Sequence, residues 1–404
     1  MNLTRRTLLG TAAVAAAAPA LRRARAQANS IKIGVLNDMS GPYRDTGGPT
    51  SVLCVKQAVE EFASKGFAVE VVSADHQNKP DLGASIASEW YDRDGVDLVI
   101  DVPTSSVALA VAGVSKQRGK AYINVGAATS DLTGKSCSPT MISYCYDTYM
   151  LGKSTGGATV KAGGNTWYFI TADYAFGHQL QIDTTSFITA AGGKVLGSSA
   201  YPFPGTTDFS SYLLQAQSSG AKVLGLCNAG ADTVNSIKQA HEFGLPQQIA
   251  AMLMFVTDVN ALGLEVAQGL HLTESYYWDL NDRTRKFCDR IKVKSPNNWP
   301  NMIHAGNYSA TLHFLKAVAD MGVGEAKKSG IAIVDRMKKM PVDDDCFQGS
   351  IRVDGRGMFP AYLFEVKKPS ESKGKWDYFK LVATSAPDQA WRPLSEGGCD
   401  FVKS

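Results

Sequence analysis

Short apolar segments alternate with amphipathic segments along this chain, and the alternation runs through twice. In the first series, apolar runs predict strands at 31–37, 68–72, 96–102 and 121–125. Helices are predicted between them at 48–64, 80–92 and 105–116. Strands that alternate with helices in this way form mostly parallel sheets covered by helices on both faces. The first series therefore predicts a doubly wound, three-layer α/β unit.

A second series of the same kind begins near residue 149. Its predicted strands lie at 167–171, 194–201, 223–227, 249–254 and 269–276. Its predicted helices lie at 149–162, 176–191, 209–218 and 232–243. We expect two α/β units of similar size, with the segment 142–147 as the first crossing between them.

The last part of the chain holds helices first and short strands afterwards. The helices are predicted at 283–293, 301–321 and 326–339, and the strands at 350–353, 361–366 and 378–383. One arrangement has this part return to complete both units, so that the chain crosses between them several times. The alternative is a pair of independent tandem domains. The absence of a linker rich in Pro, Gly or Ser between the two series favours the first arrangement.

The N-terminus has the composition of an export signal. Residues 1–26 hold five arginines and no acidic residue, and Arg5-Arg6 precedes an apolar run over 8–18. That run is shorter than the roughly 20 residues that span a bilayer, and small residues at 24–28 fit a cleavage site. Paired arginines favour the twin-arginine route over an ordinary secretory signal. We expect residues 1–28 to be a signal peptide cleaved near 26–28, and the mature protein to lie in the bacterial periplasm.

The charge balance gives no reason to expect nucleic acid or an anionic membrane as a partner. The formal net charge is +3, from 41 basic and 38 acidic residues. Without the five arginines of the leader, 36 basic residues face 38 acidic ones, a balance of −2. A nearly neutral protein lacks the basic surface that nucleic acids require.

The chain has seven cysteines and no C-x-x-C pair. Cys54 and Cys227 stand in apolar runs and are expected to be buried thiols. Cys137, Cys346 and Cys399 have polar, loop-like surroundings and are the candidates for one disulfide. Which two of them pair is left open.

Motifs for catalysis or metal binding are not evident. The sequence has no H-E-x-x-H, no Walker loop and no G-x-G-x-x-G after the first strand. The histidines have no metal-ligand spacing. The run at 343–345 lacks the glycine and distal glutamate of a calcium loop, so we expect it to be solvated. We expect no enzymatic activity, no metal and no cofactor.

Small and hydroxyl-bearing residues follow two neighbouring strands of the first unit. Ser105 and Ser106 open a helix after the strand 96–102, and Ala127 and Thr129 follow the strand 121–125. Ligands of open α/β sheets bind beyond the carboxyl ends of the strands. Hydroxyl groups and free N–H groups at a helix start suit a carboxylate. Alternatively, Ser105 and Thr129 only cap their helices.

The second unit offers a facing wall. Tyr174 and Phe176 follow the strand 167–171, and their rings could stack on a flat or apolar ligand. Asn228 follows the strand 223–227 and could orient a polar group, and Phe255 follows the strand 249–254. The alternative for Phe176 is a purely structural place in the core.

Several segments carry a resemblance to a known family. They are IKIGVLNDMSGP at 31–42, TSS at 104–106, NVGAATSDLT at 124–133, YFITADYAFG at 168–177 and GAKVLGLCNAGAD at 220–232. In this order and spacing the chain resembles the type I periplasmic solute-binding proteins of branched-chain amino acid ABC transporters. The resemblance covers nearly all of the chain from residue 31 onward.

The resemblance implies two α/β lobes, joined by three crossover strands, that close like a Venus flytrap on a ligand. It implies a carboxylate site at 104–106, Ala127 and Thr129, with Phe176, Asn228, Ala229 and Phe255 on the second lobe. Tyr43 and Arg44 could add a ring and a charge. Near the second-lobe turns, Asn228, Ala229, Phe255 and Asp258 replace the usual carboxylate and tyrosine for an ammonium group. The expected ligand is therefore an amino acid, an aromatic or other organic acid, or an amide.

We expect residues 29–145 plus 279–345 to form the first lobe, and residues 146–278 plus 346–404 the second. The expected protein is a periplasmic monomer that hands a small solute to an ABC permease of the inner membrane. A ligand-sensing periplasmic receptor and an exported α/β enzyme are the alternatives.

Overall fold

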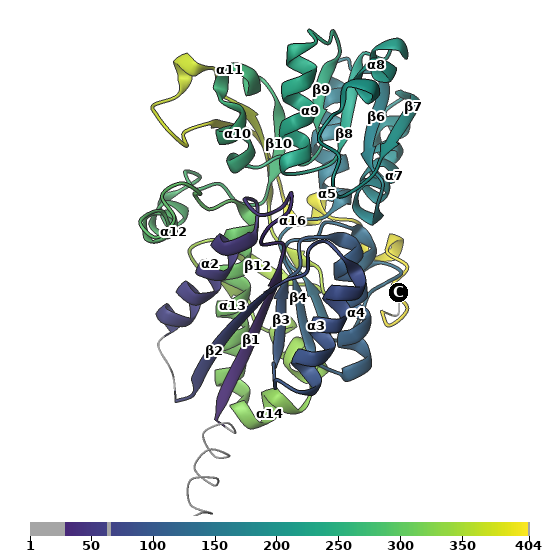
Figure 1. The fold of residues 1–404 in the computed structure, drawn as a ribbon. Helices are drawn as coiled ribbons and strands as arrows, with labels where there is room; N and C mark the ends of the chain where they lie inside the picture. Colours follow the sequence, from purple (N-terminus) through teal and green to yellow (C-terminus); the bar gives the residue numbers. More distant parts are fainter. Residues whose placement is uncertain (1–28, 63–65, 403–404) are drawn as a thin grey trace, which may run out of the picture.

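The structure, a computed structural model, describes residues 29–62 and 66–402. The predicted signal peptide lies outside the described residues, so its assignment stays a prediction. The chain folds into two α/β lobes that lie one above the other in Figure 1, with the connecting segments between them.

The first lobe is built on a five-stranded parallel sheet in the order β2-β1-β3-β4-β5. Its strands are β1 (Ser30–Asn37), β2 (Ala68–Asp75), β3 (Leu98–Asp101), β4 (Ala121–Asn124) and β5 (Met141–Ser143). Apolar side chains occupy both faces of the inner strands, which is typical of a sheet covered on both sides. Val99 and Tyr122 pack toward one layer of helices, whereas Ile100 and Ile123 pack toward the other.

Helices from distant parts of the chain cover this sheet. One layer contains α3 (Pro80–Asp92) and α4 (Ser105–Arg118). The other contains α2 (Gly48–Phe62) and α13 (Met302–Met321), which pack against each other (Figure 1). The chain therefore returns to the first lobe after it has built the second one. The two shorter helices α14 (Val323–Lys328) and α15 (Gly330–Lys338) also contact strands of this sheet.

The second lobe is built on a four-stranded parallel sheet in the order β7-β6-β8-β9. Its strands are β6 (Thr166–Ala172), β7 (Lys194–Tyr201), β8 (Val223–Cys227) and β9 (Gln248–Ala251). Helix α7 (Ala175–Ala190) covers one face, and α8 (Ser210–Ser218) and α9 (Ala231–Glu242) cover the other. The helices α10 (Val256–Leu262) and α11 (Leu264–Ala267) follow β9.

Three segments join the lobes. The first follows β5, the second runs from β10 (His271–Glu274) to α12 (Asp282–Lys292), and the third runs from α15 to β14 (Ala361–Val366). Strand β10 pairs with β14, and β14 with β15 (Phe379–Ser385), in an antiparallel sheet. The third segment contains the short strands β11 (Val342–Asp343), β12 (Gln348–Ile351) and β13 (Gly357–Met358). The predicted fold class, two α/β lobes joined by three crossings, is confirmed, whereas the predicted lobe boundaries stay a prediction.

Two of the predicted helices are divided in the structure. The predicted helix at 326–339 is α14 and α15, because the Ser329 hydroxyl accepts a hydrogen bond from the Ala332 N–H and starts a new helix. Gly330 lies directly against the backbone of Lys120, where a larger residue would collide. The predicted helix at 149–162 consists of α5 (Thr148–Leu151), a π-helical turn at Gly152–Gly156 and α6 (Gly157–Lys161). The helices α10 and α11 were not predicted.

The cysteines behave as the sequence indicated, and the structure selects one pair. Cys137 and Cys399 form the disulfide, at a sequence separation of 262, and Cys346 keeps a free thiol. Cys54 and Cys227 are buried thiols, as predicted. Among the described residues, no helix has both the length and the apolar character that a membrane span needs.

Candidate functional site

A cavity lies between the lobes, where loops from the carboxyl ends of the strands of both sheets meet. Its walls are mainly aromatic and aliphatic. The lining residues are Tyr43, Thr46, Pro103, Gly126, Ala128, Tyr146, Tyr174, Phe176, Ala229, Leu253, Phe255 and Ile303. The free space among them is ≈ 10 Å³, about what one water molecule needs. A solute can enter only if the lobes move apart.

Backbone strain shapes the first-lobe wall. Asp101, the last residue of β3, and Val102, which follows it, have φ angles of 86° and 57°, a region that side-chain-bearing residues rarely adopt. They turn the chain so that Pro103 reaches the cavity. A Cβ atom on Gly126 would lie 2.6 Å from Asp101 Oδ1 and 2.7 Å from Pro103 Cα, so only glycine fits there. Strain of this kind is common at binding sites.

The carboxyl group of Asp101 lies behind this wall. It is fully buried and accepts a hydrogen bond from the Asn37 side-chain amide. Burial raises the pKa of Asp101 to about 7, although hydrogen bonds from Ser51, Asn307 and Asn37 oppose that shift. Near neutral pH this group is therefore partly protonated.

The second-lobe wall is formed by the starts of two helices. Tyr174 immediately precedes α7, and Phe176 lies in its first turn. Helix α7 approaches β6 so closely that a Cβ atom on Gly177 would collide with the Ala172 carbonyl oxygen. Phe255 precedes α10, and its N–H donates to Asp258 Oδ2 at 2.9 Å. Burial raises the pKa of Asp258 to about 7, opposed by this hydrogen bond.

The two walls contact each other directly. The Tyr43 and Tyr174 hydroxyls are hydrogen-bonded across the cleft. Phe203 stacks on both rings, with centroid distances of 5.5 Å to Tyr43 and 4.2 Å to Tyr174. The Ala231 N–H donates to the Pro42 carbonyl oxygen at 3.1 Å. Burial, followed by the nearby Tyr174, raises the pKa of Tyr43 well above its usual value, so its hydroxyl stays protonated.

Five of the predicted site residues line the cavity: Tyr43, Tyr174, Phe176, Ala229 and Phe255. Phe176 also belongs to the buried core, so both of its predicted roles are compatible. Ala127 lies one position from the lining residues Gly126 and Ala128. The ligand-binding role of every predicted site residue stays a prediction.

The predicted polar residues make local hydrogen bonds instead of lining the cavity. The Ser105 hydroxyl accepts from the Thr129 N–H at 3.2 Å, and the Thr129 hydroxyl accepts from the Asp131 N–H at 3.4 Å. Ser106 is half-buried beside Ser105. The Asn228 amide bonds to side chains at the start of α9. The Arg44 side chain is 57% exposed and pairs with Asp45.

Several lining residues were not among the predicted site residues. Tyr146 lies in the predicted first crossing, and its hydroxyl donates to the Gly126 carbonyl oxygen. The aromatic residues of that crossing are visible in the sequence and could have indicated that it contributes to the cavity wall. Ile303 comes from α13, far away in the sequence, and no local pattern marks it.

The structure shows how the residues that were considered for metal binding or catalysis are arranged. Within the residues that the structure describes, no three His, Cys, Asp or Glu side chains are grouped closely enough to hold a metal ion. The run at 343–345 is not simply solvated, since Asp343 pairs with Arg283 and Asp345 with Arg290. Residues 152–156 match the pattern G-x-S-x-G, but they form a π-helical turn inside a helical stretch. A nucleophile elbow requires a strand-to-helix turn.

Comparison with known proteins agrees with this geometry. The family model described as periplasmic binding protein matches residues 30–375. A crystal structure of a periplasmic binding protein from Burkholderia mallei is 47% identical, with a TM-score of 0.89 over 93% of this chain and 100% of that one. A branched chain amino acid ABC transporter periplasmic ligand-binding protein from Burkholderia xenovorans LB400 is 40% identical, with a TM-score of 0.78 over 91% and 99%.

A more distant structure shares the fold. It is a solute binding protein of an ABC transporter from R. palustris in complex with benzoate, 19% identical, with a TM-score of 0.79 over 92% of this chain and 100% of that one. The family model covers most of this chain, and the 47% identical B. mallei structure matches it over 93% of its length. The chain therefore belongs to the periplasmic binding protein family, as a solute-binding protein of ABC transporters.

Proposed function

We propose that the protein binds a small aromatic acid in the cleft between its lobes and delivers it to an ABC permease. The observation that carries this proposal is the composition of the cavity wall. Five aromatic rings line it, from Tyr43, Tyr146, Tyr174, Phe176 and Phe255, and no acidic or basic side chain is among the lining residues. Aromatic rings bind flat apolar molecules by stacking and edge contacts. Hydroxyl groups of Tyr43, Tyr174 and Thr46 would orient the polar end.

The positions of the nearby acids argue against a zwitterionic amino acid as the preferred ligand. An ammonium group needs a carboxylate partner when it is buried. Asp258 accepts a hydrogen bond from the Phe255 N–H, and Glu274 accepts one from the Met302 N–H at 3.3 Å. Neither side chain lines the cavity. An amino acid is the second candidate, because the B. xenovorans relative is a branched chain amino acid ABC transporter periplasmic ligand-binding protein.

Binding would proceed by closure of the lobes. The ligand contacts both walls only in the closed form, so it shifts the population toward that form. The permease would then recognise the closed lobes. We propose that the ligand leaves chemically unchanged, that the protein acts as a monomer in the periplasm, and that residues 1–28 direct it there as a cleaved signal.

A thermal-shift screen of the protein without residues 1–28 tests the ligand class. The panel contains benzoate, 4-hydroxybenzoate, leucine, valine, short aliphatic acids and amides. We expect the melting temperature to rise with an aromatic acid, because a ligand that binds only the folded state stabilises it. Chromatography of the recovered ligand should show no conversion. A rise with amino acids alone would refute the aromatic ligand class, and a converted ligand would refute a pure binding role.

A matched pair of variants localises the binding. Phe176→Leu removes a ring from the cavity wall and should weaken aromatic-acid binding about fivefold, since an aromatic contact contributes about 1 kcal/mol beyond its area. Phe209→Leu changes an equally buried ring of the second-lobe core that does not line the cavity. It should lower the melting temperature without changing the affinity at 25 °C. Equal effects of both variants on affinity would place the ligand elsewhere.

A further inference from the structure

The segment 126–134 belongs to the cleft wall and also contacts the other lobe. Gly126 and Ala128 line the cavity. The Ser130 hydroxyl donates to Asp183 Oδ2 on α7 at 2.9 Å, and the Thr148 hydroxyl donates to the same oxygen at 2.6 Å. The position of this segment therefore affects both the shape of the cavity and the fit between the lobes.

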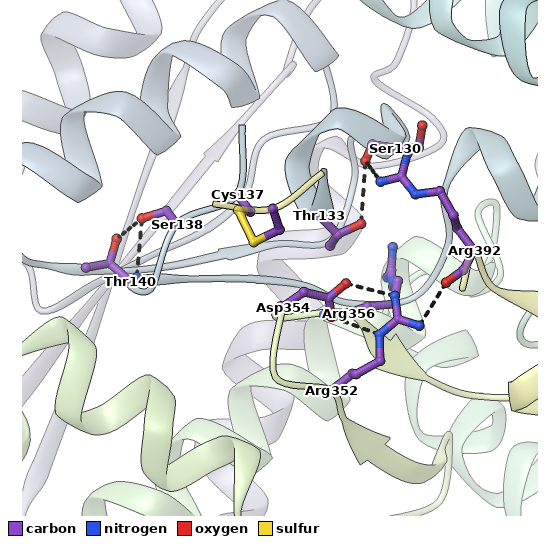
Figure 2. The surroundings of a disulfide bond; sticks show 10 residues. Ser130, Thr133, Cys137, Ser138, Thr140, Arg352, Asp354, Arg356 and Arg392 are labelled. Carbon is purple, nitrogen blue, oxygen red and sulfur yellow. Dashed lines mark hydrogen bonds and ion pairs between the residues drawn. A yellow bond between two sulfur atoms is a disulfide. The ribbon is translucent and has the colours of Figure 1, made fainter. Parts of the chain in front are cut away.

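The end of the chain lies against this segment, as Figure 2 shows. The disulfide between Cys137, which closely follows the segment 126–134 in the sequence, and Cys399 keeps the two parts of the chain together. Arg392 Nη2 donates to the Ser130 carbonyl oxygen at 2.8 Å. A Cβ atom on Gly134 would lie 2.7 Å from Arg392 Nη2 and 2.8 Å from the Gly397 carbonyl oxygen. Residues 391–399, which we call the C-terminal segment, thus pack directly on the back of the cleft wall.

The C-terminal segment is itself fixed to the third crossing. Arg352 Nη1 donates to the Arg392 carbonyl oxygen at 2.8 Å, and Asp354 holds Arg352 through two hydrogen bonds (Figure 2). The Trp391 indole N–H donates to the Phe359 carbonyl oxygen at 2.8 Å. The guanidinium of Arg356 lies 4.5 Å from the centre of the Trp391 ring, in a cation–π contact.

Arg356 connects this arrangement to the first crossing. Its Nη1 donates to the Tyr146 carbonyl oxygen at 3.0 Å and to the Ser143 hydroxyl at 3.2 Å, and it pairs with Asp147 at 3.3 Å. Arg356 and Asp147 are both buried. Tyr146 lines the cavity. The C-terminal segment therefore contacts the cleft wall on one side and, through Arg356, the crossing on the other.

We propose that the C-terminal segment positions the binding cleft, and that Arg392 is the positioning residue that holds the wall segment 126–134 in place. Arg392 does not line the cavity, so it acts through Ser130. The disulfide keeps Arg392 close to Ser130 even when the noncovalent contacts open, as expected for a protein of an oxidising compartment. This inference rests on the proposed location of the solute site between the lobes.

Hydrogen exchange measured by mass spectrometry on the ligand-free protein tests the proposal. The reporting amides are those of Leu132, Gly134 and Thr148, which donate to the Thr129, Asp131 and Ala128 carbonyl oxygens. Arg392→Ala should accelerate their exchange about tenfold, because loss of a hydrogen bond from a charged donor eases local opening. Arg392→Lys keeps one donor and should restore exchange to within about threefold of the wild type.

Two further variants make the result specific. Arg118→Ala removes a surface arginine that pairs with Asp92 on the outer helices of the first lobe, and it should leave the reporting amides unchanged. The double variant Cys137→Ser/Cys399→Ser should accelerate the same amides without Arg392 being altered. It also serves as the test if Arg392→Ala does not fold.

Two outcomes would overturn the inference. One is exchange of the reporting amides within twofold of the wild type in both Arg392→Ala and the double serine variant. The other is an equal acceleration in β6 and β8 of the second lobe, which would indicate global destabilisation. Because no ligand is added, the exchange result does not depend on which ligand the protein binds. An error in the proposed ligand class would appear only in the thermal-shift screen of the wild type.

Discussion

Asp101 couples the stability of the molecule to pH at the scale of a single residue. Its carboxyl group is fully buried at the end of β3, directly before the cavity wall. In the folded protein burial raises the pKa of Asp101 to about 7, whereas its ordinary value is 3.8. Between these two values the unfolded chain releases the proton and the folded chain keeps it. The free energy of unfolding therefore falls as pH rises from about 4 to about 7, and the contribution is constant above that range.

Replacement of Asp101 by asparagine removes this titration but leaves an acceptor for the Asn37 amide. The free energy of unfolding of Asp101→Asn, relative to the wild type, should increase with pH between 4 and 7, by an amount on the order of 4 kcal/mol. Urea unfolding at several pH values across this window measures the change. Asp94→Asn, on an exposed turn, controls for the loss of one charge. A constant difference between Asp101→Asn and the wild type would show that Asp101 ionises normally.

Among the residues predicted for the site, the aromatic ones line the cavity and the short polar ones do not. Tyr174, Phe176 and Phe255 reach the cavity because they lie at the starts of the helices that come after β6 and β9, and that position can be predicted from the sequence. The hydroxyls of Ser105 and Thr129 also follow strands, but short polar side chains bind the nearest backbone groups first. Whether such a side chain lines the cavity or bonds to the backbone depends on local geometry, which the spacing of residues in the sequence does not determine.

At the scale of elements, the contact between α7 and β6 fixes one wall of the cleft. Helix α7 carries Phe176 in the wall and Asp183 in the contact between the lobes. Gly177 allows this helix to touch the end of β6, where the Ala172 carbonyl oxygen occupies the space of a side chain. A methyl group at 177 must therefore displace the helix from the strand.

Gly177→Ala should lower the free energy of unfolding by roughly 3 kcal/mol, as overpacking against a rigid backbone does. It should also weaken solute binding, because Phe176 moves with α7. Gly113→Ala is the matched control, since Gly113 lies in α4 with open space around its Cα. That variant should raise stability by about 0.5–1 kcal/mol. Chemical unfolding measures the free energy of unfolding of both variants. If Gly177→Ala is as stable as the wild type, α7 can move away from β6 without loss of stability.

Most elements were predictable because buried parallel strands and amphipathic helices have distinct periods. The strands β1 to β4 and β6 to β8 and the helices α3, α4 and α13 lie within a few residues of their predicted positions, whereas the short strand β5 was not predicted. The short helix α10 was not predicted because it starts at Val256, close behind the four-residue strand β9, and the apolar run 249–254 looks like one longer strand. The break at Ser329 depends on packing of Gly330 against Lys120, a contact remote in sequence.

At the scale of the whole molecule, the closed arrangement depends on a close backbone contact between the lobes. Gly230, before α9, meets the loop after β1, and a Cβ atom there would lie 2.5 Å from the Pro42 carbonyl oxygen. The neighbouring Ala231 N–H donates to that same oxygen. A side chain at 230 should therefore hold the lobes apart while each lobe keeps its fold.

Gly230→Ala should abolish ligand-induced compaction, measured as the radius of gyration by small-angle X-ray scattering with and without a solute that binds the wild type. Its affinity for that solute should fall at least tenfold, since closure brings the second wall to the ligand. The φ angle of Gly230 is 59°, so alanine also adds local strain. Gly244→Ala separates the two effects, because Gly244 has the same φ angle of 59° and open space around it. That control should lose stability but compact normally, and if Gly230→Ala compacts as fully as the control, the contact at Pro42 is not part of closure.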